Sequence, residues 1–505
     1  MKSFEHPTNV NGIISINGTA WGQCFDHYTL EYGSGQIPDS WITIINSTVP
    51  IQDGILASLD TTELDEGYYI LRLRLICSNN TYEESIWMII NNECNTYIVD
   101  GEGGPGVDYI TIQDAIDDAG HGDSIYVNTG TYHERVFIRK TINLIGENKN
   151  TAVIDGDGSG SVVSIYANGV NISGFTIKNS STYGTGVRIH SFYPPAHYTD
   201  IYENILTDNG NGISISGSWS ENSSYNHIFR NNIIGNRFSG IKLVIADHNT
   251  ISDNIITDNA EEGIFFYTFS RNNIISKNTI INNHDGILIN DLTLTGFNNN
   301  NTIACNTIEN NSFGIYVKPT AYQSNDNIFY HNNFNNNIQN AYDEYNNTWD
   351  NDYPSGGNYW DTYTGVDENQ DGIGDTPYNI SGGNNQDRYP LMEPYVVDTN
   401  PPLITIMTPQ KGMIHIADMI HLQRIFSDKP LIFGKVTIFV NASDDQSDIH
   451  HVEFYIDDVF QENISNEPYA WLWSESSFSS HEIKVIAYDN VGNCASRGLT
   501  VWKFF

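Results

Sequence analysis

The run from Asp367 to Asp375 places oxygen-bearing residues at alternate positions, a spacing that suits a hard cation. The candidate calcium ligands, at positions 1, 3, 5, 7 and 9, are Asp367, Asn369, Asp371, Ile373 through its backbone carbonyl, and Asp375. Gly372 at position 6 would allow the sharp turn that such a loop needs. Position 12 is Tyr378 instead of glutamate, so the run is not a helix–loop–helix calcium motif. The sequence predicts calcium as the cofactor, and the alternative is a solvated acidic turn.

A second group of candidate residues lies along a recurring Gly-Ile-x-Ile pattern, at the x positions and two residues further on. The x positions are Arg188, Ser214, Lys242, Phe265, Leu288 and Tyr316, and two residues further on are His190, Tyr267, Asn290 and Lys318. The predicted ligand-binding residues are Arg188, Lys242, Phe265, Tyr267, Tyr316 and Lys318. Rings could stack on sugars and cations could pair with uronate or sulfate groups, so this face could bind a polysaccharide.

Two carboxylates on the same pattern are the weak candidates for catalysis. Glu262 and Asp285 directly precede consecutive glycines of the pattern, so stacking of the repeat would place them roughly 5 Å apart. Carboxylates this close can raise one pKa and act as acid and base. The alternative, which we favour, is an ordinary surface pair relieved by solvent or a cation.

The pattern belongs to a repeat with the size of a solenoid coil. Its glycines, Gly212, Gly240, Gly263, Gly286 and Gly314, are 28, 23, 23 and 28 residues apart. Apolar and polar residues alternate inside each repeat, which is the period of a strand. The sequence therefore predicts an all-β protein with a right-handed parallel β-helix, and the two longer spacings predict surface insertions of about five residues.

Equivalent residues of successive coils should stack. One predicted inward stack contains Ile213, Ile241, Ile264, Ile287 and Ile315, and a second contains Ile228, Ile251, Ile275 and Ile303. Asn231, Asn254, Asn278 and Asn306 should lie at a corner, because asparagine tolerates left-handed backbone and its amide can bond the amide of the next coil.

Composition limits the partners. The 505 residues include 61 acidic and 23 basic ones, for a net charge of −38, which argues against nucleic acid or an anionic membrane as a partner. We expect no membrane insertion, since no stretch has the length of a membrane span. The N-terminus is polar, so we expect an extracellular or cell-surface chain whose signal peptide has been removed; the alternative is a cytoplasmic protein.

The five cysteines, Cys24, Cys77, Cys94, Cys305 and Cys494, show no metal-binding spacing, and Cys305 is expected to be a small core residue.

Four parts follow from the changes in pattern along the chain. Residues 8–93 alternate as a β-sandwich, residues 94–352 form the β-helix, residues 353–399 close it and carry the calcium run and a linker, and residues 400–505 form a second sandwich. A helix over Ile112, Ala115, Ile116 and Ala119, with Thr111 as its N-cap, should cover the open end of the β-helix.

Each part resembles a known family. The segments Tyr109–Glu134, Leu144–Glu147 and Val153–Gly156, together with the coils, are similar to NosD-like and pectinesterase-like right-handed β-helices. Residues 8–93, with Gly18-Thr19-Ala20 and Gly67-Tyr68-Tyr69, resemble fibronectin-III-like modules. Residues 400–505, with a Phe-Tyr-Ile-Asp strand and an Ala-Tyr-Asp-x-x-Gly-Asn ending, resemble bacterial Ig-like modules.

The resemblance implies a fold more than a chemistry. The motif Gly130-x-Tyr132-x-Glu134 is similar to the opening motif of pectinesterases, but the paired aspartates and arginine of those enzymes have no evident counterpart downstream. The copper handling of NosD-like proteins would need clusters of Met or His, and the chain has six Met and dispersed histidines.

Two classes of function follow. The first is a non-catalytic extracellular or cell-envelope protein, structural or adhesive, whose partner is a polysaccharide, a cell-envelope glycan or another copy of itself. The second is a carbohydrate-active enzyme, a lyase, hydrolase or epimerase that uses the β-helix face. The absence of a recognisable catalytic cluster and the flanking adhesion-type modules favour the first class.

Overall fold

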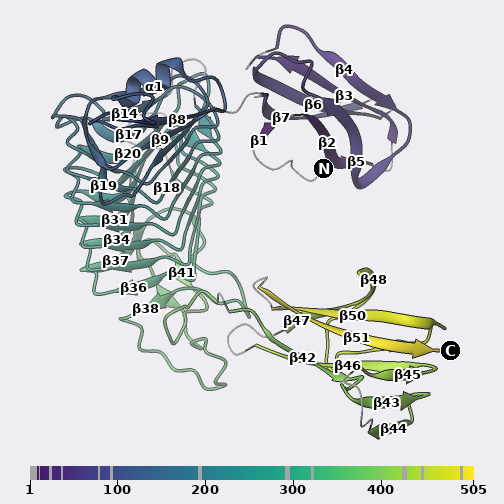
Figure 1. Ribbon diagram of the computed structural model, residues 1–505. Coiled ribbons are helices and arrows are strands. Elements are labelled where there is room, and N and C mark those ends of the chain that lie inside the picture. The colour runs from purple at the N-terminus through teal and green to yellow at the C-terminus, as the bar shows by residue number, and fades with distance from the viewer. Residues whose placement is uncertain are drawn as a thin grey trace. The chain divides into compact units, whose positions relative to one another are not determined.

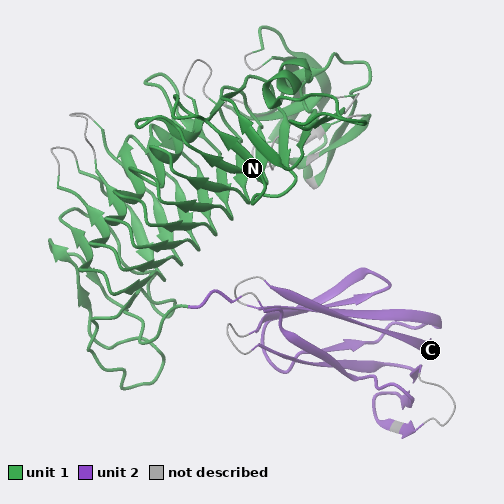
Figure 2. Cartoon of the chain, turned by 60° about the vertical axis from the view of Figure 1, so that its left-hand side comes forward, with its two compact units in different colours: residues 1–395 green, residues 396–505 purple. Residues whose placement is uncertain are grey.

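A computed structural model describes residues 8–505 except 11, 22–24, 36–37, 78–79, 91, 93–94, 191–195, 291–295, 320–322, 399, 424–428, 445–448 and 490–492. The chain divides into two compact units, residues 1–395 and 396–505 (Figure 2). The described part of the chain is all-β apart from one short helix, as the sequence predicts. In the described ranges, no helix is long and apolar enough to cross a membrane.

Unit 1 contains a parallel β-helix with three walls, each a sheet of ten strands stacked coil upon coil (Figure 1). Wall 1 consists of β8 (Thr96–Val99), β9 (Ser124–Val127), β12 (Asn143–Gly146), β15 (Asn171–Ser173), β18 (Asp200–Tyr202), β22 (His227–Phe229), β26 (Thr250–Ser252), β29 (Ile274–Ser276), β32 (Thr302–Ala304) and β35 (Ile328–Tyr330). Wall 2 consists of β10 (Gly130–His133), β13 (Ala152–Asp155), β16 (Thr176–Lys178), β19 (Ile205–Thr207), β23 (Asn232–Ile234), β27 (Ile255–Thr257), β30 (Thr279–Ile281), β33 (Thr307–Glu309), β36 (Asn333–Asn335) and β38 (Tyr359–Trp360). Wall 3 consists of β11 (Val136–Ile138), β14 (Val163–Ile165), β17 (Thr185–Ile189), β20 (Asn211–Ser216), β24 (Ile241–Val244), β28 (Glu262–Thr268), β31 (Asp285–Ile289), β34 (Phe313–Val317), β37 (Gln339–Asp343) and β40 (Ser381–Gly382).

The interior of the β-helix is built from the predicted isoleucine stacks. On wall 3, Ile213, Ile241, Ile264, Ile287 and Ile315 pair in register from coil to coil and are fully buried. On wall 1, Ile228, Ile251, Ile275 and Ile303 do the same. Both predictions are confirmed. Because each isoleucine contacts its equivalents above and below, burial of one coil depends on its neighbours.

Asparagines form a hydrogen-bonded ladder at each of the three corners. In one step, Asn278 Oδ1 accepts hydrogen bonds from the backbone N–H and the Nδ2 of Asn254, both at 3.0 Å. The Nδ2 of Asn278 in turn donates to Asn306 Oδ1 at 3.0 Å and to the carbonyl of Ile251 at 2.9 Å. The ladder between walls 1 and 2 runs through Asn204, Asn231, Asn254, Asn278, Asn306, Asn332 and Asn358. The ladder between walls 3 and 1 runs through Asn226, Asn249, Asn273, Asn301, Asn327 and Asn347. The ladder between walls 2 and 3 runs through Asn209, Asn236, Asn259, Asn283, Asn311 and Asn337.

The corner prediction needs one correction. The left-handed backbone belongs to the residue before most ladder asparagines, as at Asp253 with φ 56° and Lys277 with φ 58°, and not to the asparagine itself. The turn therefore leaves the asparagine free to use its side chain along the coil axis. Cys305 occupies such a turn position, with φ 59° and a half-buried free thiol, so it is not the core residue expected from the sequence.

The first end of the β-helix is covered by helix α1 (Ile112–Asp118), which Thr111 caps through a hydrogen bond from Asp114 N–H. The Glu134 carboxylate accepts hydrogen bonds from the N–H groups of Ile112 and Gln113, both at 2.9 Å. At the other end of α1, Lys140 Nζ donates to the carbonyl of Ala119 at 2.6 Å. Opposite charges thus satisfy the two ends of the helix dipole, and Glu134 has a structural role here.

The far end of the β-helix closes on buried acids and tryptophans. The ladder between walls 1 and 2 ends where Asn358 N–H donates to Asp387 Oδ2 at 2.7 Å, and Trp360 Nε1 donates to the same oxygen at 2.8 Å. Similarly, Trp349 Nε1 donates to Asp343 at 2.9 Å. Burial raises the pKa of Asp387 to about 7, although its hydrogen bonds act in the opposite direction. Two short strands, β39 (Tyr378–Asn379) and β41 (Gln386–Asp387), pair beside this end.

The N-terminal sandwich packs its own core in two sheets, ordered β1-β7-β6-β3-β4 and β2-β5. Its strands are β1 (Thr8–Val10), β2 (Ile13–Ala20), β3 (Phe25–Ser34), β4 (Ile42–Ser47), β5 (Ile51–Asp60), β6 (Gly67–Cys77) and β7 (Asn80–Ile90). Tyr68 OH donates to the carbonyl of Asn168 at 2.9 Å and so reaches the β-helix. Cys77 is disulfide-bonded, and Cys24 and Cys94 lie outside the described residues.

Unit 2 is a mostly antiparallel sandwich with a separate core, in which β45 pairs in parallel with both β43 and β51. Its strands are β42 (Leu403–Thr408), β43 (Met413–Ile416), β44 (Ile420–Gln423), β45 (Leu431–Phe433), β46 (Val436–Ser443), β47 (Ile449–Ile456), β48 (Val459–Ile464), β49 (Ala470–Trp473), β50 (Phe478–Asp489) and β51 (Cys494–Phe504). The second sheet, beside the three-stranded sheet β42-β46-β49, has seven strands in the order β44-β43-β45-β51-β50-β47-β48.

Replacing one ladder asparagine should destabilise unit 1. In Asn278→Ala, the buried N–H and Nδ2 of Asn254 lose their shared acceptor and the carbonyl of Ile251 loses one donor, so we expect the free energy of unfolding to fall by about 2–4 kcal/mol. Chemical denaturation followed by circular dichroism measures this change. Asn346→Ala, at an exposed position of the last coil, is the control and should stay within about 0.5 kcal/mol of the parent protein. Equal losses in both variants would contradict a special role for the ladder.

Asp387 should make stability fall with rising pH. Its pKa is about 7 in the folded chain and is ordinarily 3.8, so the folded state binds the proton more tightly. Its contribution to stability is therefore complete below about pH 4 and is lost as pH rises to about 7, by up to about 1.4 kcal/mol per pH unit. The difference in unfolding free energy between the parent protein and Asp387→Asn, measured from pH 4 to 8, should carry this slope. A difference that does not change with pH would refute the assignment.

Candidate functional site

A pocket of about 700 Å³ lies on the outer side of wall 3, over β17, β20, β24 and β28. Its lining residues are Tyr183, Thr185, Arg188, Asn211, Ser214, Ser216, Gly217, Ser218, Trp219, Ser220, Lys242, Val244, Ile245, Tyr267 and Thr268. This volume is within the ordinary range of small-molecule sites. Four residues of the predicted face, Arg188, Ser214, Lys242 and Tyr267, are therefore brought together in one concave surface.

The two cations of the pocket project from one row of wall 3. Strand register places Arg188, Ser214, Lys242 and Phe265 side by side on successive coils. The Lys242 Nζ lies 4.5 Å from the centre of the Tyr267 ring and 5.4 Å from that of Phe265. Burial lowers the pKa of Lys242, and the nearby carboxylates of Glu262 and Glu261 raise it. The aromatic rings and carboxylates thus hold a partly desolvated ammonium at the pocket wall.

Two exposed aromatic side chains border the pocket. Tyr183 is 85% exposed and stacks on Phe238 with 5.6 Å between ring centres. Trp219 is 74% exposed and meets Phe269 edge to face at 5.6 Å. Large exposed aromatic rings beside a polar cavity are unusual on the surface of a folded protein, and such rings can contact a ligand. The hydroxyls of Ser214 and Ser216, 3.1 Å apart, lie on the floor between the rings.

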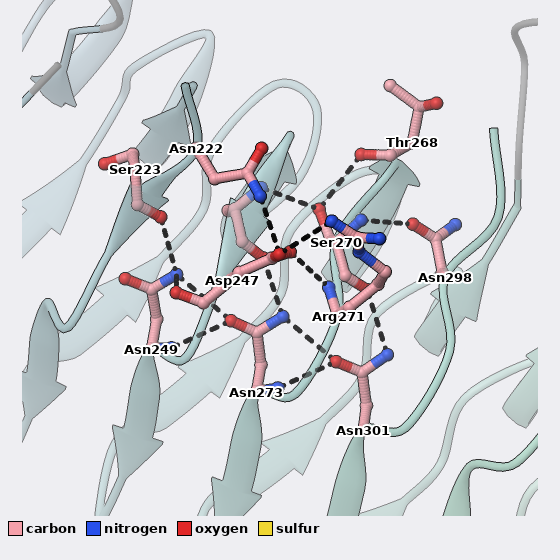
Figure 3. A network of polar contacts seen from close by, with 11 residues as sticks. Asn222, Ser223, Asp247, Asn249, Thr268, Ser270, Arg271, Asn273, Asn298 and Asn301 are labelled. Atoms are coloured by element: carbon pink, nitrogen blue, oxygen red, sulfur yellow. Dashed lines mark hydrogen bonds and ion pairs between the residues drawn. The ribbon is translucent and has the colours of Figure 1, made fainter. Parts of the chain in front are cut away.

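An ion pair between the buried Asp247 and the half-buried Arg271 supports the loop that carries Trp219. Asn222 Nδ2 donates to Asp247 Oδ2 at 2.6 Å, and the Arg271 guanidinium donates to the same oxygen at 3.0 Å (Figure 3). The same region contains the short strand pair β21 (Ser223–Ser224) and β25 (Ala246–Asp247). Figure 3 also shows Asn249, Asn273 and Asn301 of a corner ladder beside this network. The loop is therefore held to the neighbouring coils by the hydrogen bond from Asn222 to Asp247, whose carboxylate also pairs with Arg271.

Sequence reasoning did not name Tyr183, Trp219 or the serines of residues 216–220 as candidates. A signal was present for Trp219, because the spacing between Gly212 and Gly240 is 28 residues where the shorter coils have 23. The extra residues form the loop over 217–222. No periodic signal marks Tyr183, which reaches the pocket from the turn before β17.

The remaining residues of the predicted face are arranged differently. Phe265 and Leu288 follow in the same row but are only 7% and 6% exposed, so Phe265 supports Lys242 and offers little surface of its own. Tyr316 is half-buried and lies edge to face with Tyr342 at 5.4 Å. Lys318 is exposed on a later coil and does not line the pocket. His190 stacks on Tyr166 at 4.2 Å, and burial lowers its pKa to about 4.

The two candidate catalytic carboxylates stand in register on neighbouring coils, beside the pocket and outside its lining. Glu262 pairs with Asp285 across β28 and β31, and Ser239 Oγ donates to Glu262 at 2.7 Å. Burial raises the pKa of Asp285, His284 lowers it, and Glu262 raises it. His284 Nδ1 lies 3.1 Å from Asp285 Oδ1, but without hydrogen-bond geometry, so this buried oxygen has no hydrogen-bond partner.

The predicted calcium ligands form one exposed turn whose oxygens bond the loop's own amides. Asp367 accepts hydrogen bonds from Gln370 N–H at 2.7 Å and Gly372 N–H at 2.9 Å. Asp371 Oδ1 accepts from Ile373 N–H at 2.9 Å, and Asp375 Oδ2 accepts from Glu368 N–H at 2.8 Å. Asn369 Nδ2 donates to Asp371 at 2.9 Å. Calcium binding at this loop stays a prediction.

Comparisons with known proteins agree with the fold. Residues 154–365 match the sequence model of the family described as periplasmic copper-binding protein (NosD), and residues 428–485 match that of a bacterial Ig domain. The family resemblance predicted for the coils and for the C-terminal sandwich is thus confirmed. None of the curated proteins compared with the chain matches it.

Comparison with solved structures finds matches of low identity and low TM-score. A pectate lyase, Pel9A, has 15% identity over 54% of this chain and 82% of its own, with a TM-score of 0.37. The tailspike protein gp49 of the Acinetobacter baumannii bacteriophage Fri1, a capsular polysaccharide depolymerase, has 12% identity over 85% of this chain and 86% of its own, with a TM-score of 0.33. Fibronectin(III)-like modules of Clostridium thermocellum CbhA have 21% identity and a TM-score of 0.17; the match covers 23% of this chain and about half, 52%, of theirs.

Proposed function

We propose that this protein is a non-catalytic extracellular or cell-envelope protein that binds an acidic polysaccharide in the wall 3 pocket. The observation that carries the proposal is the joining of two cations, three aromatic rings and a floor of hydroxyls in one cavity of about 700 Å³. Sugar rings present apolar faces to aromatic side chains and hydroxyls to polar ones, so this mixture is complementary to a saccharide.

The cations favour an acidic sugar over a neutral one. The planar guanidinium of Arg188 can bind a carboxylate or sulfate through two parallel hydrogen bonds, and Lys242 adds a point charge two coils away. The chain as a whole has a charge of −38, so long-range repulsion would slow the approach of a polyanion. Recognition would therefore act at short range, and moderate salt should favour it by screening the distant charges.

An extracellular or envelope location fits two observations. Cys77 is disulfide-bonded, and disulfides persist in oxidising compartments. The family that matches residues 154–365 is described as periplasmic.

Copper, which that family description names, does not suit the residues present. Among the described residues, one cluster of converging metal-binding side chains contains a histidine: His133, Asp155 and Asp157. Asp155 already accepts hydrogen bonds from Asn179 Nδ2 at 2.9 and 3.0 Å and lies 3.4 Å from Lys178 Nζ. A single imidazole beside engaged carboxylates does not supply the nitrogen and sulfur ligands that copper prefers.

Pocket substitutions should weaken binding of acidic oligosaccharides without unfolding the coils. We expect Lys242→Met and Tyr267→Ala each to raise the Kd for oligo-uronates or sulfated oligosaccharides by about tenfold or more, measured by calorimetry after a glycan array has identified a ligand. Lys318→Met is the matched control, because it removes an exposed lysine three coils further along the same wall. Equal weakening by Lys318→Met would assign binding to general charge on wall 3.

The alternative function, cleavage or epimerisation of the polysaccharide, rests on the register of Glu262 with the buried Asp285. Assays for new reducing ends and for unsaturated products distinguish the two functions. A binder should show no turnover. Asp285→Asn should leave its affinity unchanged, and Glu262→Gln should change the affinity only through the loss of a charge near Lys242. Turnover that both substitutions abolish would replace the binding proposal with the enzymatic one.

We also propose that the loop from Asp367 to Asp375 binds calcium through the alternating oxygens predicted from the sequence. Calcium would draw the carboxylates of Asp367, Asp371 and Asp375 from the loop amides and bind them together, with the Ile373 carbonyl as a further ligand. Only the folded loop presents these oxygens together, so calcium should stabilise the closing segment.

Asp371→Asn should therefore remove a calcium-dependent rise in the melting temperature of unit 1. We expect the parent protein to melt at a lower temperature in chelator than in millimolar calcium, and the variant to lose the part of this shift that belongs to unit 1. Calorimetric melting curves measure both. Identical shifts in the parent protein and the variant would exclude the loop as a calcium site.

A further inference from the structure

Three carboxylates of the Ig-like unit converge from distant parts of its sequence. Asp398 lies in the segment before β42, Asp444 directly follows β46, and Asp489 is the last residue of β50. One carboxylate oxygen of each lies within 4.8 Å of those of the other two. Like charges at this spacing repel one another, so the arrangement costs free energy unless something neutralises it.

One of the three carboxylates has a buried oxygen without a partner. Asp398 is 7% exposed and Asp489 is 2% exposed, and among the described residues Asp398 Oδ2 has no hydrogen-bond partner. The other oxygen of Asp398 accepts a hydrogen bond from Asn400 N–H at 2.9 Å, which holds the carboxylate in place. A buried anionic oxygen that lacks a donor is costly, and a bound cation is one of the few partners that would relieve it.

The carboxylates are held in position by their neighbours. Asn493 donates from its backbone N–H to Asp489 Oδ1 and from Nδ2 to Asp489 Oδ2, both at 2.8 Å. The same Nδ2 reaches the backbone carbonyl of Asp398 at 3.2 Å. Pairing of β42 with β46, with Leu403 opposite Ser443, brings the chain near Asp398 beside Asp444. Hydrogen bonds thus hold Asp398 and Asp489 in place, and the strand pairing places Asp444 beside them.

We propose that Asp398, Asp444 and Asp489 form a calcium site in unit 2. The three carboxylates supply only oxygen ligands, which favour hard cations over zinc or copper. Calcium binds oxygen at about 2.3–2.6 Å, so two ligands on opposite sides of one ion lie at most about 5 Å apart, and the observed separations fit within this limit. The ion would connect the segment before β42 to the ends of β46 and β50 and so stabilise the sandwich.

This site can be tested separately from the loop at Asp367–Asp375, because the two lie in different units. The experiment uses the full chain carrying Asp371→Asn, and calcium binding is measured by equilibrium dialysis and calorimetry. We expect one bound calcium per chain in this background. Adding Asp444→Asn, or separately Asp398→Asn, should raise the Kd by about tenfold or more or abolish binding.

Asp458→Asn is the matched control, since it removes an exposed aspartate of the same unit that pairs with Lys484 at 3.0 Å. It should keep the calcium affinity and the calcium-dependent rise in the melting temperature of unit 2. The proposal is overturned if the Asp371→Asn chain binds no calcium, or if Asp444→Asn and Asp398→Asn bind it as tightly as the control. Circular dichroism of each variant shows whether loss of binding accompanies loss of fold. A variant that is unfolded is replaced by the other one.

Discussion

The structure of the β-helix depends on one repeated hydrogen-bond exchange between asparagines of adjacent coils. Each corner turns the chain and leaves backbone N–H and C=O groups that no strand can satisfy. A ladder asparagine such as Asn254 donates to a carbonyl of the preceding coil and to the side chain of Asn278 in the next. It also accepts two hydrogen bonds from Asn231. Because every buried polar group in the step is paired, the corners are as well satisfied as the walls, and the isoleucine stacks can close without a polar penalty.

Two of the ladders end on buried acids, and charged residues also satisfy the helix at the first end of the β-helix. At the far end, Asp387 and Asp343 accept the hydrogen bonds of the last amide and indole groups, and burial raises the pKa of both carboxyls. At the first end, Glu134 and Lys140 satisfy the two ends of the helix that covers the coils. Glu134, which belongs to the motif similar to that of pectinesterases, therefore stabilises the fold by binding the first N–H groups of the helix. The same residue types that suggest catalysis in a sequence can be structural when they meet unsatisfied backbone.

The pocket shows how a repetitive scaffold acquires a site. Regular coils present rows of equivalent side chains, and rows alone leave a flat wall. Extra residues in one coil raise a loop with Trp219, and the Asp247–Arg271 pair anchors it to the coils beneath. Arg188 and Lys242, which lie in one row of wall 3, then line the pocket beside this loop. Local departure from the period, laid on a rigid wall, creates the shape and chemical variety that saccharide recognition needs.

The sequence by itself determined the coil period, the buried isoleucines and the corner asparagines, because residues one period apart must stack in a solenoid. It also determined the row from Arg188 to Tyr316 and the register of Glu262 with Asp285. Only the tertiary structure decided that Phe265 in this row is buried, and that a left-handed residue precedes most of the ladder asparagines. It alone brought Asp398, Asp444 and Asp489 together. Such contacts join residues with no common period, so they depend on how loops and sheets pack in three dimensions and leave no regular signal in the chain.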